Sequence, residues 1–142
     1  MNFRYKRLRV CCSLLLLLWG LEPAAHAQRG VAVKVDENSL RKIAVKRVMP
    51  DYPEESIKQG TKGVTVTELT VNSKGDVVGL EVLEAPDEMI KQAVAGAVNQ
   101  WKFKPTASEG RPVSLKGKLT FYFVIDERGG ARVENPRQFG EK

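Results

Sequence analysis

The sequence predicts an α+β fold in which a three-stranded antiparallel sheet packs against two helices. Three observations favour this class: two β-rich runs flank a turn cluster within residues 63–84, an amphipathic helix pattern occupies residues 85–101, and an alternating run fills residues 113–125. At 142 residues and a formal charge of +6, the chain holds at most one domain of this kind.

Residues 1–27 have the composition of a secretory signal peptide. Basic residues precede an apolar run of roughly a dozen residues, which is too short to cross a hydrocarbon core of about 30 Å comfortably. The sequence Ala25-His26-Ala27 then precedes Gln28 and provides a cleavage site. We therefore expect export by a cleaved signal, and the alternative is a retained signal that anchors the chain in a membrane.

Removal of residues 1–27 would take both cysteines and the only histidine with it. The remaining chain would then have no disulfide, no ordinary zinc site and no Ser-His or Cys-His nucleophile pair. Its paired carboxylates, Glu54-Glu55 and Asp87-Glu88, stand at predicted helix N-termini, where the helix dipole favours negative charge. The sequence therefore predicts a protein that is not an enzyme and that holds no cofactor and no metal.

The folded domain is expected over residues 43–126, preceded by a leader or linker at 28–42. Its first element is a short helix at 53–59. Pro53 can occupy the first helical position, where its missing N–H costs nothing, and Gly60 can end the helix in a left-handed cap.

A β-hairpin is expected next, over residues 63–84. The turn cluster Asn-Ser-Lys-Gly-Asp places Gly75 where a positive φ is needed. Neither face of the first strand is uniformly apolar, because Thr65 and Thr67 share a face with Leu69 and Val71. Either a bulge near Thr67 or partial cover on both faces would explain this pattern.

The helix within residues 85–101 carries a single apolar stripe. Its members recur at helical spacing and are Ile90, Ala93, Val94, Ala97, Val98 and Trp101. Because Trp101 closes the stripe, we expect it in the core, with Lys102 and Lys104 in solvent. Stacking on nucleic acid is disfavoured, since residues 1–27 hold four of the 23 basic and one of the 17 acidic residues, which leaves only +3 on residues 28–142.

The last strand of the sheet is expected within residues 113–125. One face would hold Val113, Leu115, Leu119, Phe121, Phe123 and Ile125, and the other would hold Ser114, Lys116, Lys118, Thr120 and Tyr122. Such alternation is typical of a strand with one buried face. Residues 127–142 are expected to form a polar tail, with a short strand at 131–134.

Taken in order, these motifs resemble the TonB C-terminal domain family over residues 45–125. The markers are Tyr52, Pro53, Gly63, Gly75, Trp101, Phe103, Pro105, Gly110 and Pro112. The resemblance implies a periplasmic domain of the cell envelope that serves outer-membrane transport. It also implies an exposed sheet edge that receives a partner's extended peptide, and this edge maps to Leu115, Lys116, Gly117, Lys118, Leu119, Thr120, Phe121, Tyr122 and Phe123.

The resemblance implies a protein partner. The expected partner is a TonB-box-like segment of an outer-membrane receptor, or another envelope protein, bound by strand addition. Two alternatives stay open: a structural or regulatory homodimer or adaptor that uses the same edge, and a short transducer held in the inner membrane by an uncleaved signal. Energy-coupling members have a membrane anchor and a long proline-rich spacer, whereas residues 28–42 would span only about 50 Å when fully extended.

Overall fold

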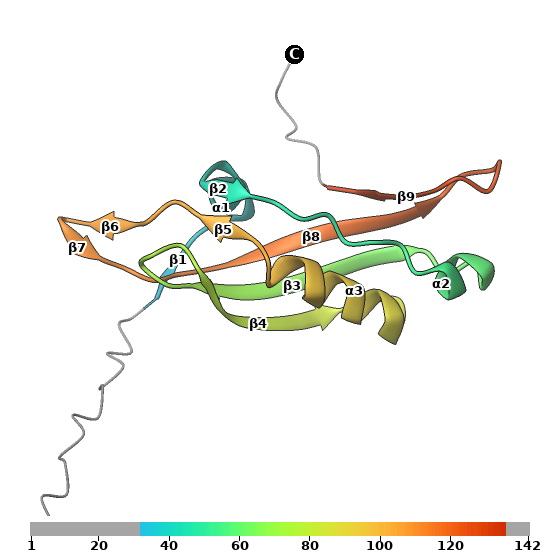
Figure 1. Ribbon diagram of the computed structural model, residues 1–142, viewed down its shortest axis with the longest axis horizontal. Coiled ribbons are helices and arrows are strands. Elements are labelled where there is room, and N and C mark those ends of the chain that lie inside the picture. The colour runs from blue at the N-terminus through green and yellow to red at the C-terminus, as the bar shows by residue number, and fades with distance from the viewer. Residues whose placement is uncertain (1–31, 136–142) are drawn as a thin grey trace, which may run out of the picture.

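The computed structural model describes residues 32–135, whose arrangement is shown in Figure 1. Three helices occur in this part of the chain, and they are α1 (Glu37–Lys42), α2 (Glu54–Lys58) and α3 (Glu88–Val98). The strands are β1 (Val33–Lys34), β2 (Ala44–Lys46), β3 (Gly63–Val71), β4 (Val77–Glu84), β5 (Lys102–Phe103), β6 (Ala107–Ser108), β7 (Arg111–Pro112), β8 (Leu115–Ile125) and β9 (Ala131–Glu134).

The main sheet is built around the antiparallel pair β3 and β8. Its strand order is β1-β8-β3-β4, and β9 also pairs with β8. β2 pairs with β5 and β6 pairs with β7 in two small separate sheets. The α+β class is confirmed, but the expected three strands and two helices are too few, because short strands and a further helix surround the three long strands.

Part of the expected leader is folded. Residues 33–42, assigned to a linker from their weak pattern, form β1 and α1. The helix begins where the Asp36 side chain accepts a hydrogen bond from the Ser39 backbone N–H at 3.0 Å, which satisfies a free donor of the first turn. Leu40 is fully buried in the core. The helix is too short for a periodic pattern to show in the sequence, and its burial depends on distant partners.

The hairpin and its bulge are confirmed. β3 and β4 pair antiparallel, and the register shifts between Val66 and Thr67 and again between Thr70 and Val71. Thr67 is fully buried, and its hydroxyl donates to the Leu119 carbonyl at 3.2 Å. A buried threonine is therefore accommodated in this strand because its polar atom has a partner.

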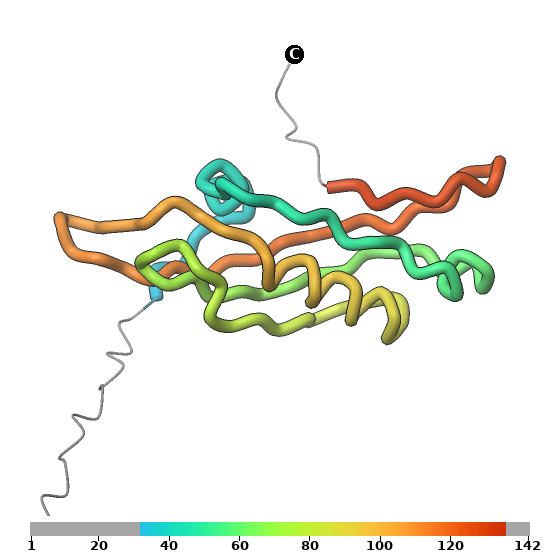
Figure 2. Tube along the Cα trace, viewed as in Figure 1, coloured from blue at the N-terminus to red at the C-terminus, as the bar shows by residue number. Residues whose placement is uncertain are grey.

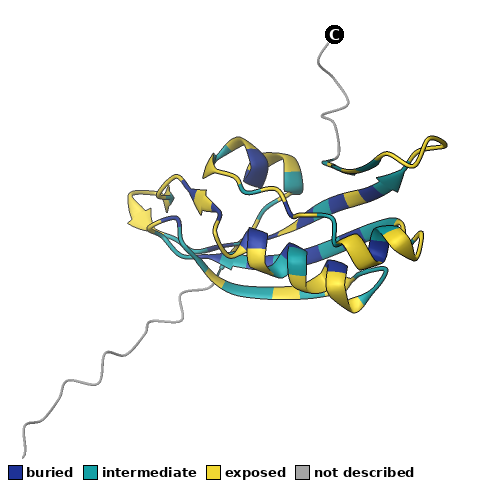
Figure 3. Ribbon diagram, turned by 45° about the vertical axis from the view of Figure 1, so that its right-hand side comes forward, coloured by how far each residue is buried: buried dark blue, intermediate teal, exposed yellow. Residues whose placement is uncertain are grey.

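The core lies between the sheet and α3, as the buried residues in Figure 3 show. The Asp87 side chain caps the helix by accepting from the Ile90 N–H at 2.7 Å. Trp101 follows the helix and is fully buried, with its indole N–H donating to the Val48 carbonyl at 2.7 Å. Its ring meets Phe121 edge-on at a centroid distance of 6.2 Å. The expected core role of Trp101 is confirmed.

The prediction for Gly75 is confirmed, whereas Pro53 lies one residue before the first helical position that the sequence predicted for it. Pro53 is the N-cap of α2 and stands just before its first helical residue, Glu54. Gly75 adopts a φ of 95°, as the turn cluster requires. Its carbonyl also accepts a hydrogen bond from the Phe103 N–H at 2.9 Å, so the hairpin turn lies directly against β5.

We expect Trp101→Ala to lower the free energy of unfolding by about 3–5 kcal/mol, because it leaves a cavity and removes the donor to Val48. Urea denaturation measures the change. The control is Lys104→Ala, because Lys104 is exposed, and we expect it to change the free energy of unfolding little. An unchanged midpoint for Trp101→Ala would contradict its role in the core.

We expect Gly75→Ala to be far more destabilising than Gly60→Ala. Both glycines have a positive φ, so both substitutions carry a conformational cost of about 1–2 kcal/mol. Only at Gly75 would the new Cβ lie 1.9 Å from the Phe103 carbonyl oxygen, whereas nothing lies within 4 Å at Gly60. Thermal unfolding of the two variants separates these effects, and equal losses would argue against the close contact with β5.

Candidate protein-binding edge of the sheet

β8 has neighbours on both of its sides. On one side it pairs with β3 from Leu115 to Phe123. On its outer side, β1 pairs in parallel with Leu115 and Lys116, and β9 pairs antiparallel with residues 122–125. The expectation that residues 115–123 form a free edge is therefore wrong at both ends of the strand. The alternation of apolar and polar residues predicts which face of a strand is buried, but it does not predict which strands lie beside it in the sheet.

Side chains of α1 cover the middle of this outer side. The Thr120 backbone N–H donates to Glu37 Oε1 at 2.8 Å, and the Thr120 hydroxyl donates to Glu37 Oε2 at 2.9 Å. Arg41 Nη2 donates to the Thr120 carbonyl at 2.7 Å. Both backbone groups of Thr120 are thus satisfied by side chains, in the place where a neighbouring strand would supply a carbonyl and an N–H.

Arg41 is the most buried of the three residues that form these hydrogen bonds. It is 6% exposed and donates to Glu37 Oε1 from both Nε, at 2.9 Å, and Nη2, at 2.6 Å. Its guanidinium carbon lies 5.9 Å from the Trp101 ring centroid and 5.6 Å from that of Phe121. A buried guanidinium is stable only when it is paired, so Glu37 and the Thr120 carbonyl are required partners.

Gly117 lets the N-terminal segment approach β8. A Cβ at this position would lie 3.1 Å from Leu40 Cδ2 and 3.1 Å from the Val35 carbonyl oxygen. Sequence reasoning missed Glu37 and Arg41 as members of this edge. The one signal that could have pointed to them is Gly117 itself, because a glycine inside a strand often marks the close approach of another segment.

A surface hollow of about 490 Å³ lies beside the covered stretch. It is lined by Lys34, Val35, Asp36, Glu37, Glu68, Lys116, Gly117, Lys118 and Thr120. Lys116 and Glu68 form an ion pair of 2.6 Å across β8 and β3, and the hydrogen bond from Lys116 lowers the pKa of the Glu68 carboxyl. The hollow is therefore polar and carries charges of both signs.

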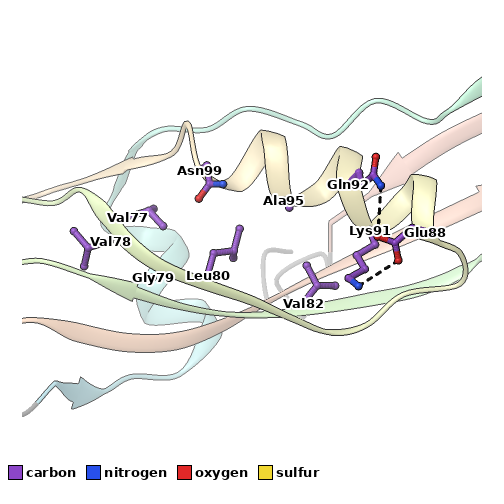
Figure 4. A pocket seen from close by; sticks show the side chains of 10 residues that line it. All are labelled: Val77, Val78, Gly79, Leu80, Val82, Glu88, Lys91, Gln92, Ala95 and Asn99. Atoms are coloured by element: carbon purple, nitrogen blue, oxygen red, sulfur yellow. Dashed lines mark hydrogen bonds and ion pairs between the residues drawn. The ribbon is translucent and has the colours of Figure 1, made fainter.

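β4 is the other edge of the main sheet, and no described strand pairs with its outer side. A hollow of about 440 Å³ separates it from α3 and is shown in Figure 4, with Glu88 joined to Lys91 and Gln92. Exposed Glu81 and Glu84 lie on this strand, whose register shifts twice against β3. Charges and bulges of this kind oppose the addition of another strand.

The predicted marker residues support the fold around this edge. The Tyr52 ring packs edge-on against Phe123 at 5.1 Å, and its hydroxyl donates to the Thr61 carbonyl at 2.5 Å. Burial, and to a lesser extent the charge of Asp87, raises the pKa of Tyr52. A Cβ on Gly63 would lie 3.0 Å from Pro86.

The remaining markers lie in the core and in or before the β6–β7 hairpin. Phe103 belongs to the core, with its ring 6.1 Å from that of Trp101. Gly110 has a φ of 74° in the turn between β6 and β7, Pro112 ends β7, and Pro105 lies exposed in the connection before them. None of these markers contacts the outer side of β8 through a described hydrogen bond.

Residues 32–135 hold neither a cluster of metal-ligating side chains nor a membrane-spanning helix. In this part of the chain no three His, Cys, Asp or Glu side chains are grouped as metal ligands would be. No helix there is long and apolar enough to cross a membrane. The absence of catalysis, cofactor and metal stays a prediction, and the predicted signal peptide at 1–27 lies outside the described residues.

Comparison with known proteins identifies relatives of this domain. Protein TonB of Pseudomonas aeruginosa is 31% identical over 80 residues, and Protein TonB of Vibrio cholerae is 27% identical over 81 residues. Each match covers 56% of this chain but only 23% and 33% of the respective relative. The solution NMR structure of the Pseudomonas aeruginosa TonB CTD superimposes with a TM-score of 0.51 at 29% identity, covering 60% of this chain and 87% of that one.

The family match rests on more than half of the chain. Residues 48–125 match the family described as Gram-negative bacterial TonB protein C-terminal. This span contains α2, α3, and the long strands β3, β4 and β8, so the expected resemblance is confirmed. The chain belongs to the TonB C-terminal family.

Proposed function

We propose that this chain is a non-enzymatic envelope protein that binds an extended peptide of a partner by adding it as a strand along the outer side of β8. The observation that carries the proposal is the incomplete cover of this side. β8 is 11 residues long, whereas β1 contributes two residues and β9 four, and no strand of the described part of the chain pairs with residues 117–121 on the outer side of β8.

The covering strands contribute little buried surface. Both residues of β1 are exposed, and β9 alternates between half-buried and exposed residues. A peptide that replaced them would form a longer uninterrupted ladder on β8, with affinity from main-chain hydrogen bonds. Lys116 and Lys118 stand on the polar face beside that position and would attract acidic side chains of the peptide.

The proposed partner is a TonB-box-like segment of an outer-membrane receptor, or another envelope protein. Membership of the TonB C-terminal family supports a partner of this kind. The same membership supports a proposed role in transmembrane transport. The proposed place is the periplasm after cleavage of residues 1–27, and the alternative is the periplasmic side of the inner membrane.

The same edge would also serve a homodimer or an adaptor. Two copies would pair through β8, or the chain would occupy the site of a transducer without coupling energy. In both cases the contacts made by β8 are those of strand addition, so one experiment distinguishes them by what binds.

We expect a synthetic TonB-box peptide to shift backbone amide signals of β8 in a ¹⁵N NMR titration. The largest changes should fall on Lys116, Lys118, Thr120 and Tyr122, since Thr120 directs its N–H away from β3 and alternate residues share that direction. A peptide of scrambled sequence is the control.

Other patterns of change would revise the proposal. Shifts confined to β4 would place the peptide at the opposite edge of the sheet. Shifts of the same β8 amides on raising the protein concentration, without peptide, would identify a homodimer. Absence of any change along β8 at saturating peptide would contradict strand addition there.

A further inference from the structure

We propose that residues 33–42 are a built-in cover of the peptide site, and that Glu37 is an internal ligand that holds the middle of β8 closed in the free protein. This inference rests on the proposed function, because it assigns a regulation to that same site. Figure 2 shows α1 and β9 on the side of β8 opposite to β3.

The first part of the cover, β1, is itself paired with β8 as an added strand would be. The Val33 N–H donates to the Ser114 carbonyl at 2.8 Å, and the Val35 N–H donates to the Lys116 carbonyl at 2.9 Å. The backbone then turns at Asp36 into α1 and leaves β8. A peptide and β1 would use the same backbone groups of β8, so both cannot be bound there at once.

Farther along β8, the side chains of Glu37 and Arg41 bind the backbone groups that an added strand would bind. The Glu37 carboxylate takes the place of a strand carbonyl at the Thr120 N–H, and the Arg41 guanidinium takes the place of a strand N–H at the Thr120 carbonyl. Charge-assisted hydrogen bonds of this kind are stronger than neutral ones. The pair therefore completes one rung of a ladder and competes directly with an incoming peptide.

The cover has a firmly held part and an accessible part. Leu40 is fully buried and Arg41 is 6% exposed, so α1 stays anchored in the core. The Glu37 side chain is 23% exposed and borders the hollow of about 490 Å³. A displacement of this side chain that keeps its carboxylate paired with Arg41 would free the Thr120 N–H while the helix remains docked, and a carbonyl of the peptide would then take the place of the carboxylate at that N–H.

The cover also lies outside the residues that match the family. The family match begins at residue 48, so β1 and α1 precede it. The predicted consequence is that a peptide binds the free protein more weakly than the uncovered edge would allow, by the fraction of molecules in which the cover is open.

The test compares Glu37→Ala with the wild-type chain in two measurements. Without peptide, hydrogen exchange of the Thr120 amide should accelerate at least about tenfold, because its acceptor is gone, whereas the Leu119 and Phe121 amides should keep their rates since they face β3. With the TonB-box peptide, affinity should rise by about tenfold if the closed form holds about nine-tenths of the molecules.

Two further variants keep the result interpretable. Glu55→Ala removes an exposed glutamate of α2 that pairs with Lys58 at 2.9 Å, and it should change neither measurement. Glu37→Gln retains a neutral acceptor and should give an intermediate rate for the Thr120 amide. It also provides the comparison if Glu37→Ala does not fold.

Each outcome decides one statement. An unchanged Thr120 exchange rate in Glu37→Ala and Glu37→Gln would overturn the closing role of Glu37. Faster exchange with unchanged or weaker peptide binding would show that Glu37 protects Thr120 without competing with the peptide, and would also overturn the proposal. If no variant binds the peptide, the proposed function fails, while the exchange rates still decide whether Glu37 closes the edge.

Discussion

The antiparallel register between β3 and β8 is the constraint on which the rest of the structure depends. It runs without a shift from Gly63 opposite Phe123 to Val71 opposite Leu115. A change of one residue would turn the apolar face of each strand to solvent, so the packing of both strands against the core holds this register. With it in place, α3 and Trp101 close the core on one face, and the outer side of β8 becomes the surface on which β1, α1 and β9 assemble.

The outer side of β8 shows how a sheet edge can be closed without a full strand. Short strands cover its two ends, and Glu37 and Arg41 satisfy the backbone of Thr120 between them. Short, charged and interrupted cover protects the edge from unwanted pairing with other chains. The same features provide fewer main-chain hydrogen bonds than a continuous ladder would, and this difference is the basis of the proposed strand addition.

Much of the fold could be predicted because its signals are local. The apolar stripe from Ile90 to Trp101, the turn at Gly75 and the alternation from Leu115 to Phe123 each appear within one segment, and each corresponds to an observed element. The short strand at 131–134 is also predicted, and the bulge at Thr67 is one of the two explanations that the strand pattern leaves open. The candidate site was predicted less well: its strand was identified, but β1, Glu37 and Arg41 were not.

The sequence by itself determined the long helix α3, the long strands β3, β4 and β8, and the buried faces of α3 and β8, since helical and strand periodicities are properties of neighbouring residues. Only the tertiary structure decided that β8 lies inside the sheet and that residues 33–42 belong to the domain. Glu37 is separated from Thr120 by 83 positions, and Arg41 from the same residue by 79. No pattern within a segment records contacts of that separation, because they form only when the core has brought α1 against β8.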